Sequence, residues 1–515
     1  MGPRLKIDIY LTHFVVQVLD RMLYGPIATF VDDLTSYKFE WNRKYRRLVR
    51  VKDKAYCVVY EEDGIFRYPL PILKQLLSLV GYNYKVAFEQ IEIHNHIPDD
   101  IGDPFNDGVE YDSYKIPRDY QVEYINELTK NKRDVRFVDL QTGRGKGLIA
   151  IYSLMKLGKK FAIILLPKYI EKWIRELEEL TTLTSFRICV LQGADSFISV
   201  MSDPQYYRDN YDVFIFSMRS LMLYIDEFEN TRPVGWDLLK YPISPDQLLK
   251  SLGVGIVLSD EAHQEFHALY RAMMFLTPEK LIGLSATLDS HDKKMKYLYE
   301  MLFPTNSRIS NIIGYNKYID VIAAAYYIKD GKKIPCVKSQ GYSHILFEQY
   351  CLKNTRLLKQ QDEMYLYYAK TYYGKRRKPG QKLLVFCSTV DMCKHLAKVF
   401  AKEYPKLKVG TYVQEDAYDE LMSSDITVST IISSGTAVDI PNLITVLQTI
   451  SIGSLQANIQ AMGRLRKLEG TELYYVYTYC KSIPKQWELN NKRESSIGDK
   501  AKSYTYVKYN KELSK

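Results

Sequence analysis

The sequence predicts an α/β protein built on parallel sheets, because short apolar runs and helical segments alternate along it. Runs such as FAIILLP (161–167) and DVFIFS (212–217) are typical of strands buried on both faces of a sheet. The segment KYIEKWIRELEEL (168–180) lies between two such runs and has helical spacing, as crossover helices between parallel strands do. The alternation extends from about residue 114 to 312 and resumes after 315, so we expect two α/β halves of similar size.

Length, composition and charge indicate the class of protein. At 515 residues the chain is too long for one compact domain, and we expect roughly three or four units of ordinary size. Hydrophobic residues make up 46% of the chain and charged residues 26%, as in soluble globular proteins. Lys and Arg outnumber Asp and Glu by 71 to 61, and the net charge of +10 favours acidic partners such as nucleic acid.

The cysteine pattern and the start of the chain bear on the cellular compartment. The seven cysteines form no C-x-x-C pair, which indicates reduced thiols rather than a disulfide framework or a zinc site. The start MGPRLKIDIY lacks the apolar run of a signal peptide, and no stretch is long and apolar enough to span a membrane. We therefore expect a cytoplasmic protein with no membrane partner.

Changes in composition divide the chain into four segments. The first mixes short strand-like runs with the amphipathic stretch LPILKQLLSLVGY (70–82), as a small α+β domain does, and the polar stretch 96–113 is typical of a linker. The next two segments hold the α/β halves, and the last is expected to be a basic, partly disordered tail. The predicted boundaries are 1–105, 106–313, 314–490 and 491–515.

A glycine-rich turn joins the strand candidate RFVDL (136–140) to the helix candidate LIAIYSLMKLG (148–158). Glycines in such a turn let backbone N–H groups approach a phosphate, while the helix N-terminus and a lysine add positive potential. We therefore expect a phosphate-bearing nucleotide, ATP, at this turn. The expected contacts come from Thr142, Gly143, Arg144, Gly145, Lys146 and Gly147.

Gly147 departs from the usual phosphate loop. In that loop the lysine is followed by Ser or Thr, whose hydroxyl holds magnesium. Here the position after Lys146 is a glycine, which removes that ligand. Because Mg²⁺ commonly keeps several waters in nucleotide sites, we expect a water molecule to fill the missing place.

Two carboxylates follow an apolar strand in VLSDEAHQEF (257–266). Ligands of open α/β sheets bind outside the carboxyl ends of the strands, so this pair is expected to face the glycine-rich turn. There Asp260 is expected to hold Mg²⁺, and Glu261 is expected to polarise the water that attacks the γ-phosphate.

Two further motifs contribute hydroxyls and arginines. The strand candidate LIGLSATL (281–288) ends in Ser285 and Thr287, whose hydroxyls are expected to hydrogen-bond the Asp-Glu-Ala-His segment and link nucleotide state to interdomain movement. The segment NIQAMGRLRKLEG (458–470) is expected to lie near the start of a helix, where guanidinium groups suit a γ-phosphate clamp. Its candidates are Gln460, Arg464 and Arg466, with Lys467 as the alternative to Arg466; we favour the arginine because only it binds phosphate in a bidentate way.

In this order, the motifs resemble those of the superfamily 2 helicases and translocases over about residues 114–485. IPRDYQVEYINEL (116–128) resembles their adenine-recognition segment, which implies nucleotide contacts from Arg118 and Gln121. STIISSGTAVDIPNL (429–443) resembles their motif with Gly-x-Asp near the nucleotide; Asp439 remains, and Ala437 replaces the glycine. The resemblance also implies that His263, with Ser285 and Thr287, couples nucleotide state to movement.

The resemblance implies two tandem RecA-like lobes of the P-loop NTPase fold, with ATP and Mg²⁺ bound between them and nucleic acid crossing both. The amino-terminal runs YKFEWNRKYRRLVRV (37–51) and LPILKQLLSLVGY are similar to the first domain of phage recombination helicases of the UvsW kind. This similarity implies an ATP-dependent DNA helicase or translocase that remodels branched DNA by branch migration, fork reversal or strand annealing. Its partners would be branched, forked or single-stranded DNA, bound without sequence preference, and replication or recombination proteins, in a host bacterial cytoplasm if a phage encodes it.

Three alternative functions stay open. An RNA helicase is one, since Asp-Glu-Ala-His also occurs in a large group of RNA helicases. A nucleic-acid-binding protein with an impaired ATPase is another. A restriction-enzyme motor is the third, although the sequence beyond the lobes has no nuclease-like Asp…Glu-x-Lys cluster.

Two smaller patterns are each open to two interpretations. His94 and His96 alternate on a possible strand beside carboxylates, which fits a metal site, but ordinary linker residues are the favoured interpretation. The stretch YLYYAKTYYGKRRK (365–378) interleaves aromatic and basic residues, as single-strand binders do. For this stretch we favour core packing with a basic edge over direct contact with DNA.

Overall fold

The structure is a computed structural model. It describes residues 2–42, 47–97, 102–141, 143–231, 240–286, 288, 292–309, 317–338, 341–413, 418–431 and 440–514. The chain divides into two compact units, one holding most of the residues up to 313 and the other holding residues 314–515 together with 141–143 and 289–291. Across the described ranges, every helix is too short or too polar to span a bilayer.

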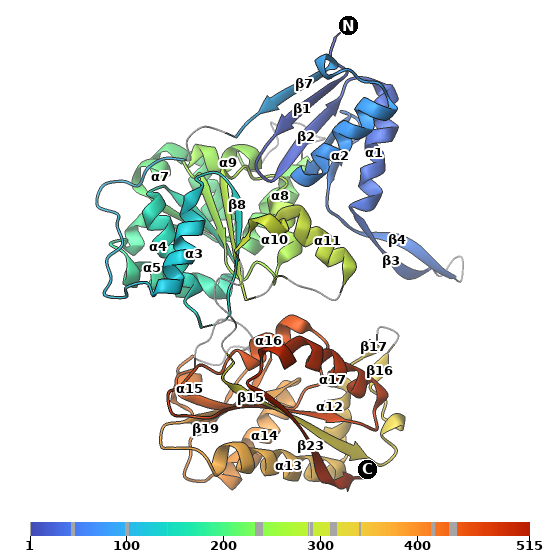
Figure 1. The fold of residues 1–515 in the computed structure, drawn as a ribbon, viewed down its shortest axis with the longest axis vertical. Coiled ribbons are helices and arrows are strands. Elements are labelled where there is room, and N and C mark those ends of the chain that lie inside the picture. The colour runs from blue at the N-terminus through green and yellow to red at the C-terminus, as the bar shows by residue number, and fades with distance from the viewer. Residues whose placement is uncertain are drawn as a thin grey trace. The chain divides into compact units, whose positions relative to one another are not determined.

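A five-stranded sheet with two helices beside it forms the amino-terminal domain of the first unit (Figure 1). The strand order is β5-β6-β2-β1-β7, and all neighbours are antiparallel except the parallel pair β1–β7. Ile7, Phe14, Ile27 and Leu76 are fully buried in the core that strands and helices share. The elements are β1 (Leu5–Ile9), β2 (His13–Val18), α1 (Tyr24–Asp33), β5 (Val58–Tyr60), β6 (Ile65–Pro69), α2 (Leu73–Ser78) and β7 (Ile91–Asn95).

A separate hairpin stands out from this domain (Figure 1). Its strands, β3 (Thr35–Asn42) and β4 (Arg47–Ala55), pair antiparallel with each other and form a two-stranded sheet of their own. The hairpin strands lie in and beside the run YKFEWNRKYRRLVRV (37–51), for which the sequence indicated a similarity to the first domain of phage recombination helicases.

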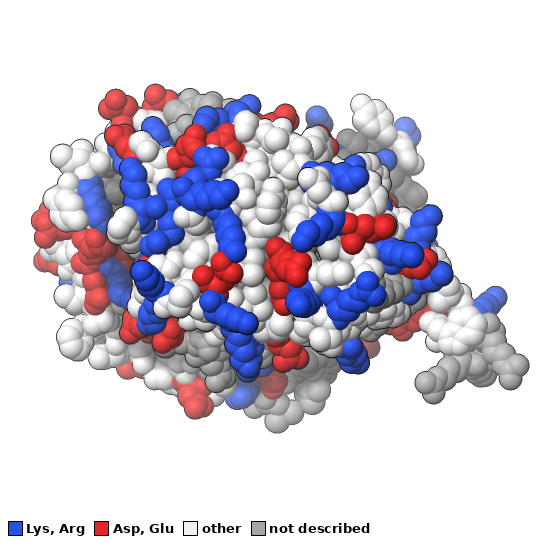
Figure 2. Space-filling view, turned by 90° about the horizontal axis from the view of Figure 1, so that it is seen from below, with Lys and Arg blue, Asp and Glu red and all other residues white. Residues whose placement is uncertain are grey.

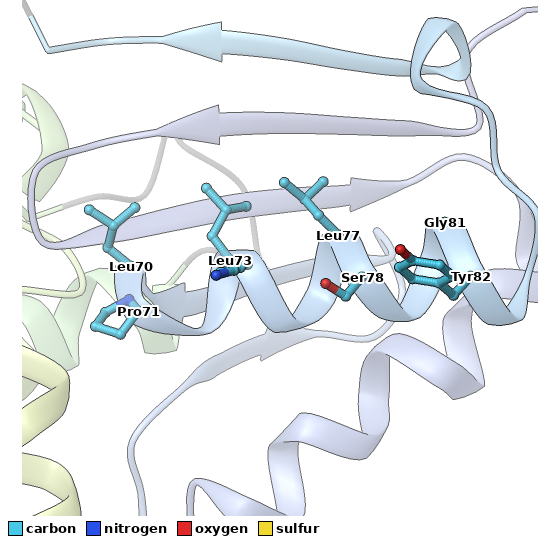
Figure 3. A pocket seen from close by; sticks show the side chains of 8 residues that line it. Leu70, Pro71, Leu73, Leu77, Ser78, Gly81 and Tyr82 are labelled. Atoms are coloured by element: carbon cyan, nitrogen blue, oxygen red, sulfur yellow. The ribbon is translucent and has the colours of Figure 1, made fainter.

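The stretch around α2 is amphipathic, as predicted. Leu76 and Val80 are fully buried on one side. Leu70, Leu73 and Leu77 project together from another side and line an open apolar groove of about 790 Å³ (Figure 3).

A seven-stranded parallel sheet forms the centre of the first lobe (Figure 1). Its order is β10-β11-β9-β12-β13-β8-β14. The strands are β8 (Val135–Asp139), β9 (Phe161–Leu165), β10 (Ile188–Leu191), β11 (Val213–Ser217), β12 (Ile256–Ser259), β13 (Lys280–Ser285) and β14 (Arg308–Ile309). The helices are α3 (Asp119–Lys130), α4 (Lys146–Leu157), α5 (Ile170–Leu180), α6 (Ala194–Ser202), α7 (Pro204–Asn210), α8 (Met218–Thr231), α9 (Pro245–Ser251), α10 (Phe266–Ala272) and α11 (Lys293–Leu302).

Strand order explains how distant motifs meet in this lobe. β13 lies between β12 and β8, so the carboxyl ends of these three strands are neighbours. β9, β11, β12 and β13 are buried along their whole length, which accounts for the continuous apolar runs in the sequence.

The amino-terminal domain is docked on the first lobe by polar contacts. The Thr12 hydroxyl donates to the carbonyl of Met273 at 2.8 Å, and the Tyr56 hydroxyl lies 2.7 Å from Nδ1 of His267. Buried side chains of the domain and the lobe belong to one continuous core. The domain is therefore part of the first unit.

A second seven-stranded parallel sheet forms the second lobe, in the order β19-β20-β18-β21-β22-β15-β23. The strands are β15 (Ile319–Ile328), β18 (Lys382–Cys387), β19 (Val409–Tyr412), β20 (Ile426–Thr430), β21 (Leu443–Gln448), β22 (Leu473–Cys480) and β23 (Ser503–Leu513), and a small ladder joins β16 (Val337–Lys338) to β17 (Gly341–Tyr342). The helices are α12 (His344–Lys353), α13 (Thr355–Ala369), α14 (Val390–Glu403), α15 (Tyr418–Ser423), α16 (Leu455–Met462) and α17 (Pro484–Ile497). The predicted fold class, two tandem RecA-like lobes with a small α+β amino-terminal domain, is confirmed.

The end of the chain differs from the sequence-based expectation of a basic, partly disordered tail. Helix α17 continues to Ile497, and β23 pairs in parallel with β15 at the edge of the sheet. Tyr509 and Leu513 are buried, whereas both lysines of β23, Lys508 and Lys511, are exposed. The charge of this segment concealed a strand pattern, because Tyr, Thr and Val favour strands.

Candidate nucleotide-binding site in the first lobe

The glycine-rich turn connects β8 to α4, as predicted. Gly143 and Gly145 have φ values of +82° and +81°, in the left-handed region that favours glycine. A side chain at position 145 would also place its Cβ 2.4 Å from Nε2 of Gln121. The turn therefore requires glycine at position 145 for its backbone and for its neighbour, and α4 starts directly after it at Lys146.

Helix α3 holds the turn from one side. Gln121 accepts a hydrogen bond from the backbone N–H of Arg118 at 2.9 Å and donates to the carbonyl of Arg144 at 3.0 Å. The hydroxyl of Tyr120 donates to the same carbonyl, also at 3.0 Å. The structure thus brings the predicted adenine-recognition segment to the glycine-rich turn.

Lys146 and β13 lie at the other side of the turn. The ammonium of Lys146 donates to the carbonyl of Leu140 at 3.2 Å, so its charge lies over the turn. The backbone N–H of Leu140 in turn donates to the carbonyl of Ser285 at 3.1 Å. The glycine-rich turn and the end of β13 are therefore directly connected.

Asp260 follows β12, and its side chain is 7% exposed. Its Oδ2 accepts a hydrogen bond from Nε1 of Trp173 at 3.0 Å and lies 3.9 Å from Nζ of Lys172. Burial and the charge of Glu261 raise the pKa of Asp260, while Lys172 and Lys146 act in the opposite direction. A carboxylate in this position gains from a nearby cation.

Glu261 has an uncommon backbone conformation. Its φ is +48°, a left-handed value that costs a residue with a side chain about 1–3 kcal/mol. The conformation is held on both sides, because its N–H donates to Oδ1 of Asp260 at 2.9 Å and the next N–H, of Ala262, donates to the carbonyl of Leu284 at 3.1 Å. Such strain is found most often at functional sites.

His263 meets Ser285, as the sequence predicted for a hydroxyl at the end of this strand. The two are joined by a hydrogen bond of 2.5 Å between Nδ1 and the hydroxyl oxygen. Burial, with help from the charge of Lys146, lowers the pKa of His263 to about 4, so its ring is neutral near pH 7.

Helix α5 brings in side chains that sequence reasoning missed. A Cβ at Gly147 would lie 2.5 Å from Oε2 of Glu176, so that carboxylate lies beside the glycine. Lys172 Nζ lies 3.6 Å from Oε1 of the same carboxylate, and Trp173 donates to Asp260. The signal in the sequence was the spacing Lys-Trp-x-x-Glu, which puts all three side chains within one helical turn.

The carboxylates near this sheet edge are of the chemical kind that binds magnesium, although their oxygens are not gathered into one cluster in the described residues. Oε2 of Glu176 and Oε2 of Glu261 are buried and have no hydrogen-bond partner among the described residues. Asp260 adds a third carboxylate. Mg²⁺ prefers oxygen ligands of this kind. Residues that hold the ion would come from this set.

In the second lobe, the arginine motif follows a helix instead of starting one. Ser454 caps the start of α16, and the helix ends at Met462, where the N–H of Gly463 donates to the carbonyl of Ile459 at 2.8 Å. Gln460 is in the last turn of α16, and Arg464 and Arg466 come after it. The prediction that this motif lies near a helix start is wrong, because the apolar periodicity lies before the arginines.

The two arginines differ in exposure. Arg464 is buried, with 5% of its surface exposed. Arg466 is half-buried, and its guanidinium donates to the carbonyl of Gly463. Lys467 is exposed. The remaining predicted site residues, Thr142, Thr287 and Asp439, lie outside the described residues, as does Ala437.

The structure also describes the histidine pair, His94 and His96, and the Tyr-rich stretch 365–378. His94 is in β7, and His96 follows it; His96 Nε2 lies 2.7 Å from Oδ1 of Asp8, and His94 Nδ1 lies 3.4 Å from the same oxygen. These side chains form a histidine–carboxylate cluster on the surface. In the Tyr-rich stretch, Tyr365, Tyr368 and Tyr373 are buried, in agreement with core packing, while Tyr367 is 54% exposed.

Basic side chains occur in several groups on the face shown in Figure 2. Acidic side chains lie between these groups, so the basic residues on this face do not merge into one continuous patch.

Comparison with known proteins assigns part of the chain. Residues 114–290 match the family described as "Type III restriction enzyme, res subunit" (ResIII). This range contains the glycine-rich turn, Asp260, Glu261 and Ser285. The sequence has no match among curated proteins.

Several solved structures are similar to most of this chain at 14% identity. The crystal structure of T4 UvsW covers 99% of both chains with a TM-score of 0.34. S. cerevisiae Dbp5 bound to RNA and ADP BeF3 covers 77% of this chain and 90% of its own, with a TM-score of 0.49. A fragment of a putative HsdR subunit of a type I restriction enzyme from Vibrio vulnificus covers 95% of this chain and 82% of its own, with a TM-score of 0.47. At these TM-scores the likenesses carry no functional argument.

Proposed function

We propose that this chain, a protein of the superfamily 2 helicase type, is an ATP-dependent DNA helicase or translocase that remodels branched DNA. The observation that carries the ATPase part is the meeting of Lys146, Asp260 and Glu261 at one edge of the first sheet. The glycine-rich turn at that edge is shaped for close approach of a phosphate.

Each side chain has a defined task in ATP hydrolysis. Lys146 offers its charge to the phosphates, and Glu261 orients and deprotonates the attacking water. Asp260 helps to hold magnesium, which neutralises charge on the phosphate oxygens when bound. From the second lobe, Gln460, Arg464 and Arg466 are assigned to the γ-phosphate clamp, because guanidinium groups pair with phosphate in a bidentate way.

The β3–β4 hairpin supports the nucleic-acid part of the proposal. Residues that face each other across the hairpin share one side, and that side carries Tyr37, Phe39 and Trp41 opposite Lys52, Arg50 and Leu48. Phe39 and Trp41 are 70% and 62% exposed. The guanidinium of Arg50 lies 3.6 Å from the centre of the Tyr37 ring.

Exposed aromatic rings alternating with cations suit a single strand, whose bases stack on rings while its phosphates pair with the cations. Such contacts do not read sequence. We therefore assign the amino-terminal domain to binding DNA, and the two lobes to moving it. Branch migration, fork reversal or strand annealing in phage replication, recombination or repair is the process we propose.

The test is a comparison of nucleic acids as activators of ATP hydrolysis. Single-stranded DNA, forked DNA, a four-way junction and RNA are each added to the purified protein with Mg²⁺, and phosphate release is measured. We expect DNA to stimulate hydrolysis, branched DNA most strongly, and both Lys146→Ala and Glu261→Gln to abolish it. RNA stimulation without DNA stimulation would favour the RNA helicase instead.

An ATPase-deficient binding protein is distinguished in the same experiment. Such a protein would bind DNA but release no phosphate with any nucleic acid. Binding of labelled DNA by the Glu261→Gln variant provides the control, because this variant keeps the fold and the binding surface while losing the general base.

A further inference from the structure

The missing hydroxyl at Gly147 raises the question of which group takes its place. In the sequence this position offers only a hydrogen atom, and water is the simple replacement. The structure contains a different candidate, because a carboxylate from another helix lies where a side chain at position 147 would begin.

Three features make Oε2 of Glu176 the candidate replacement for the missing hydroxyl. Its Oε2 would be 2.5 Å from a Cβ at position 147, it is buried, and it has no hydrogen-bond partner among the described residues. A buried carboxylate oxygen without a partner is costly, so the site gains when a cation reaches it.

The surroundings of Glu176 connect it to the rest of the site. Lys172, one turn earlier in α5, lies 3.6 Å from Oε1 of Glu176 and 3.9 Å from Oδ2 of Asp260. Oε1 of Glu176 therefore faces a lysine, whereas Oε2 is directed toward the start of α4 at Gly147. Lys172 compensates part of the negative charge that Glu176 and Asp260 bring together.

We propose that Glu176 replaces the missing hydroxyl and supplies, through Oε2, an oxygen to the coordination shell of magnesium beside Asp260. This assignment rests on the proposed ATPase function. It explains why glycine is suited to position 147, since Ser or Thr would displace the carboxylate. In this chain, the oxygen that a hydroxyl at position 147 would supply therefore comes from helix α5.

The proposal makes positions 147 and 176 interchangeable as sources of the ligand. In Gly147→Ser, the new side chain pushes the flexible end of Glu176 aside and offers a hydroxyl in its place. Loss of Glu176 should therefore matter in the natural chain and be nearly silent in the Gly147→Ser background. Such non-additivity is the signature of two groups that serve one function.

The experiment measures Mn²⁺ binding to the full chain in the presence of ADP, by electron paramagnetic resonance. Mn²⁺ is a suitable probe because it shares the preference of Mg²⁺ for oxygen ligands. Five variants are compared with the natural chain. They are Glu176→Gln, Glu176→Ala, Gly147→Ser, Gly147→Ser with Glu176→Gln, and Glu171→Gln as the control.

We expect Glu176→Gln and Glu176→Ala to weaken Mn²⁺ binding at least about tenfold, the scale of losing a group that holds a bound metal. Glu171 is an exposed glutamate of the same helix, and Glu171→Gln should bind Mn²⁺ normally. Gly147→Ser and its double variant should bind Mn²⁺ about equally well. Thermal unfolding of each variant checks that it is folded.

Three outcomes would overturn the assignment. Unchanged Mn²⁺ affinity in both Glu176 variants, with normal binding by the natural chain, refutes the role of Glu176 and leaves the ATPase intact. An equal loss in the Gly147→Ser background shows that Glu176 acts only through the structure. Absence of Mn²⁺–ADP binding by the natural chain itself would refute the ATPase, and the assignment with it.

Discussion

The side chains of Ser285 and His263 join the Asp-Glu-Ala-His segment to the neighbouring strand, beside the backbone hydrogen bond from Ala262 to Leu284. Their hydrogen bond is buried, and the backbone carbonyl of Ser285 also receives the N–H of Leu140 at the start of the phosphate-binding turn. Ser285 thus contacts both nucleotide-site segments. A residue in this position suits the transmission of a change at the phosphates.

Ser285→Ala should separate hydrolysis from movement. The substitution leaves Lys146, Asp260 and Glu261 in place but leaves the buried ring of His263 short of one partner, at a cost of about 1–2 kcal/mol in stability. We expect ATP hydrolysis to persist while the number of base pairs opened per ATP falls several-fold. Both quantities can be measured on the same forked DNA.

Ser153→Ala is the matched control for that variant. Ser153 is a fully buried serine of α4 whose hydroxyl donates to the carbonyl of Ile149 at 2.7 Å. Its loss should lower stability without changing the yield of opened base pairs per ATP. If both variants lower that yield equally, the role assigned to Ser285 fails.

At the scale of elements, the β3–β4 hairpin presents a candidate DNA-binding surface that the sequence motifs do not include. Among the strands that the structure describes, β3 and β4 pair with each other and with no other strand, so their side chains are not needed to complete a larger sheet. Its exposed rings are therefore free for contact with a partner, which is why we assign them to a DNA strand.

Trp41→Ala should weaken the binding of single-stranded DNA about tenfold, since a base stacked on an aromatic ring contributes about 1–3 kcal/mol. Thermal stability should hardly change, because Trp41 is 62% exposed. Fluorescence anisotropy with a labelled oligonucleotide measures the affinity.

Val49→Ala tests whether the effect belongs to one side of the hairpin. Val49 faces Glu40 across the ladder, on the side opposite to Trp41. This variant should bind DNA as the natural chain does. Equal affinity of the Trp41 variant and the natural chain would remove the hairpin from the DNA-binding surface.

At the scale of the whole molecule, the last residues complete a core instead of trailing from it. β23 covers the free edge of β15, and Leu513 is almost fully buried. Because the chain forms two compact units, loss of this strand should affect one of them.

Deletion of residues 503–515 should lower the unfolding temperature of the second unit and leave that of the first unit unchanged. The physical reason is the exposure of the paired backbone of β15 and of the apolar side chains beneath β23. Differential scanning calorimetry resolves the two transitions. Lys508→Ala, which changes an exposed side chain of the same strand, should leave both transitions where they are.

The sequence by itself determined the α/β class, the two parallel-sheet halves and the order of the motifs. Buried parallel strands must be continuously apolar, and a phosphate-binding turn must be rich in glycine, so both leave a local pattern that can be read in one stretch of sequence. Gly145 and the strand before Asp260 are examples, and the structure has both where the patterns indicated.

Only the tertiary structure decided which side chains meet across elements. Glu176 is 29 positions from Gly147 in the sequence. The two residues come together because α5 packs against α4. The same holds for β23, whose basic residues obscured a strand that becomes stable only against β15. A turn or a buried strand can be predicted from neighbouring residues in the sequence. A ligand position shared by two helices, or a strand at a sheet edge, forms only when distant elements pack together.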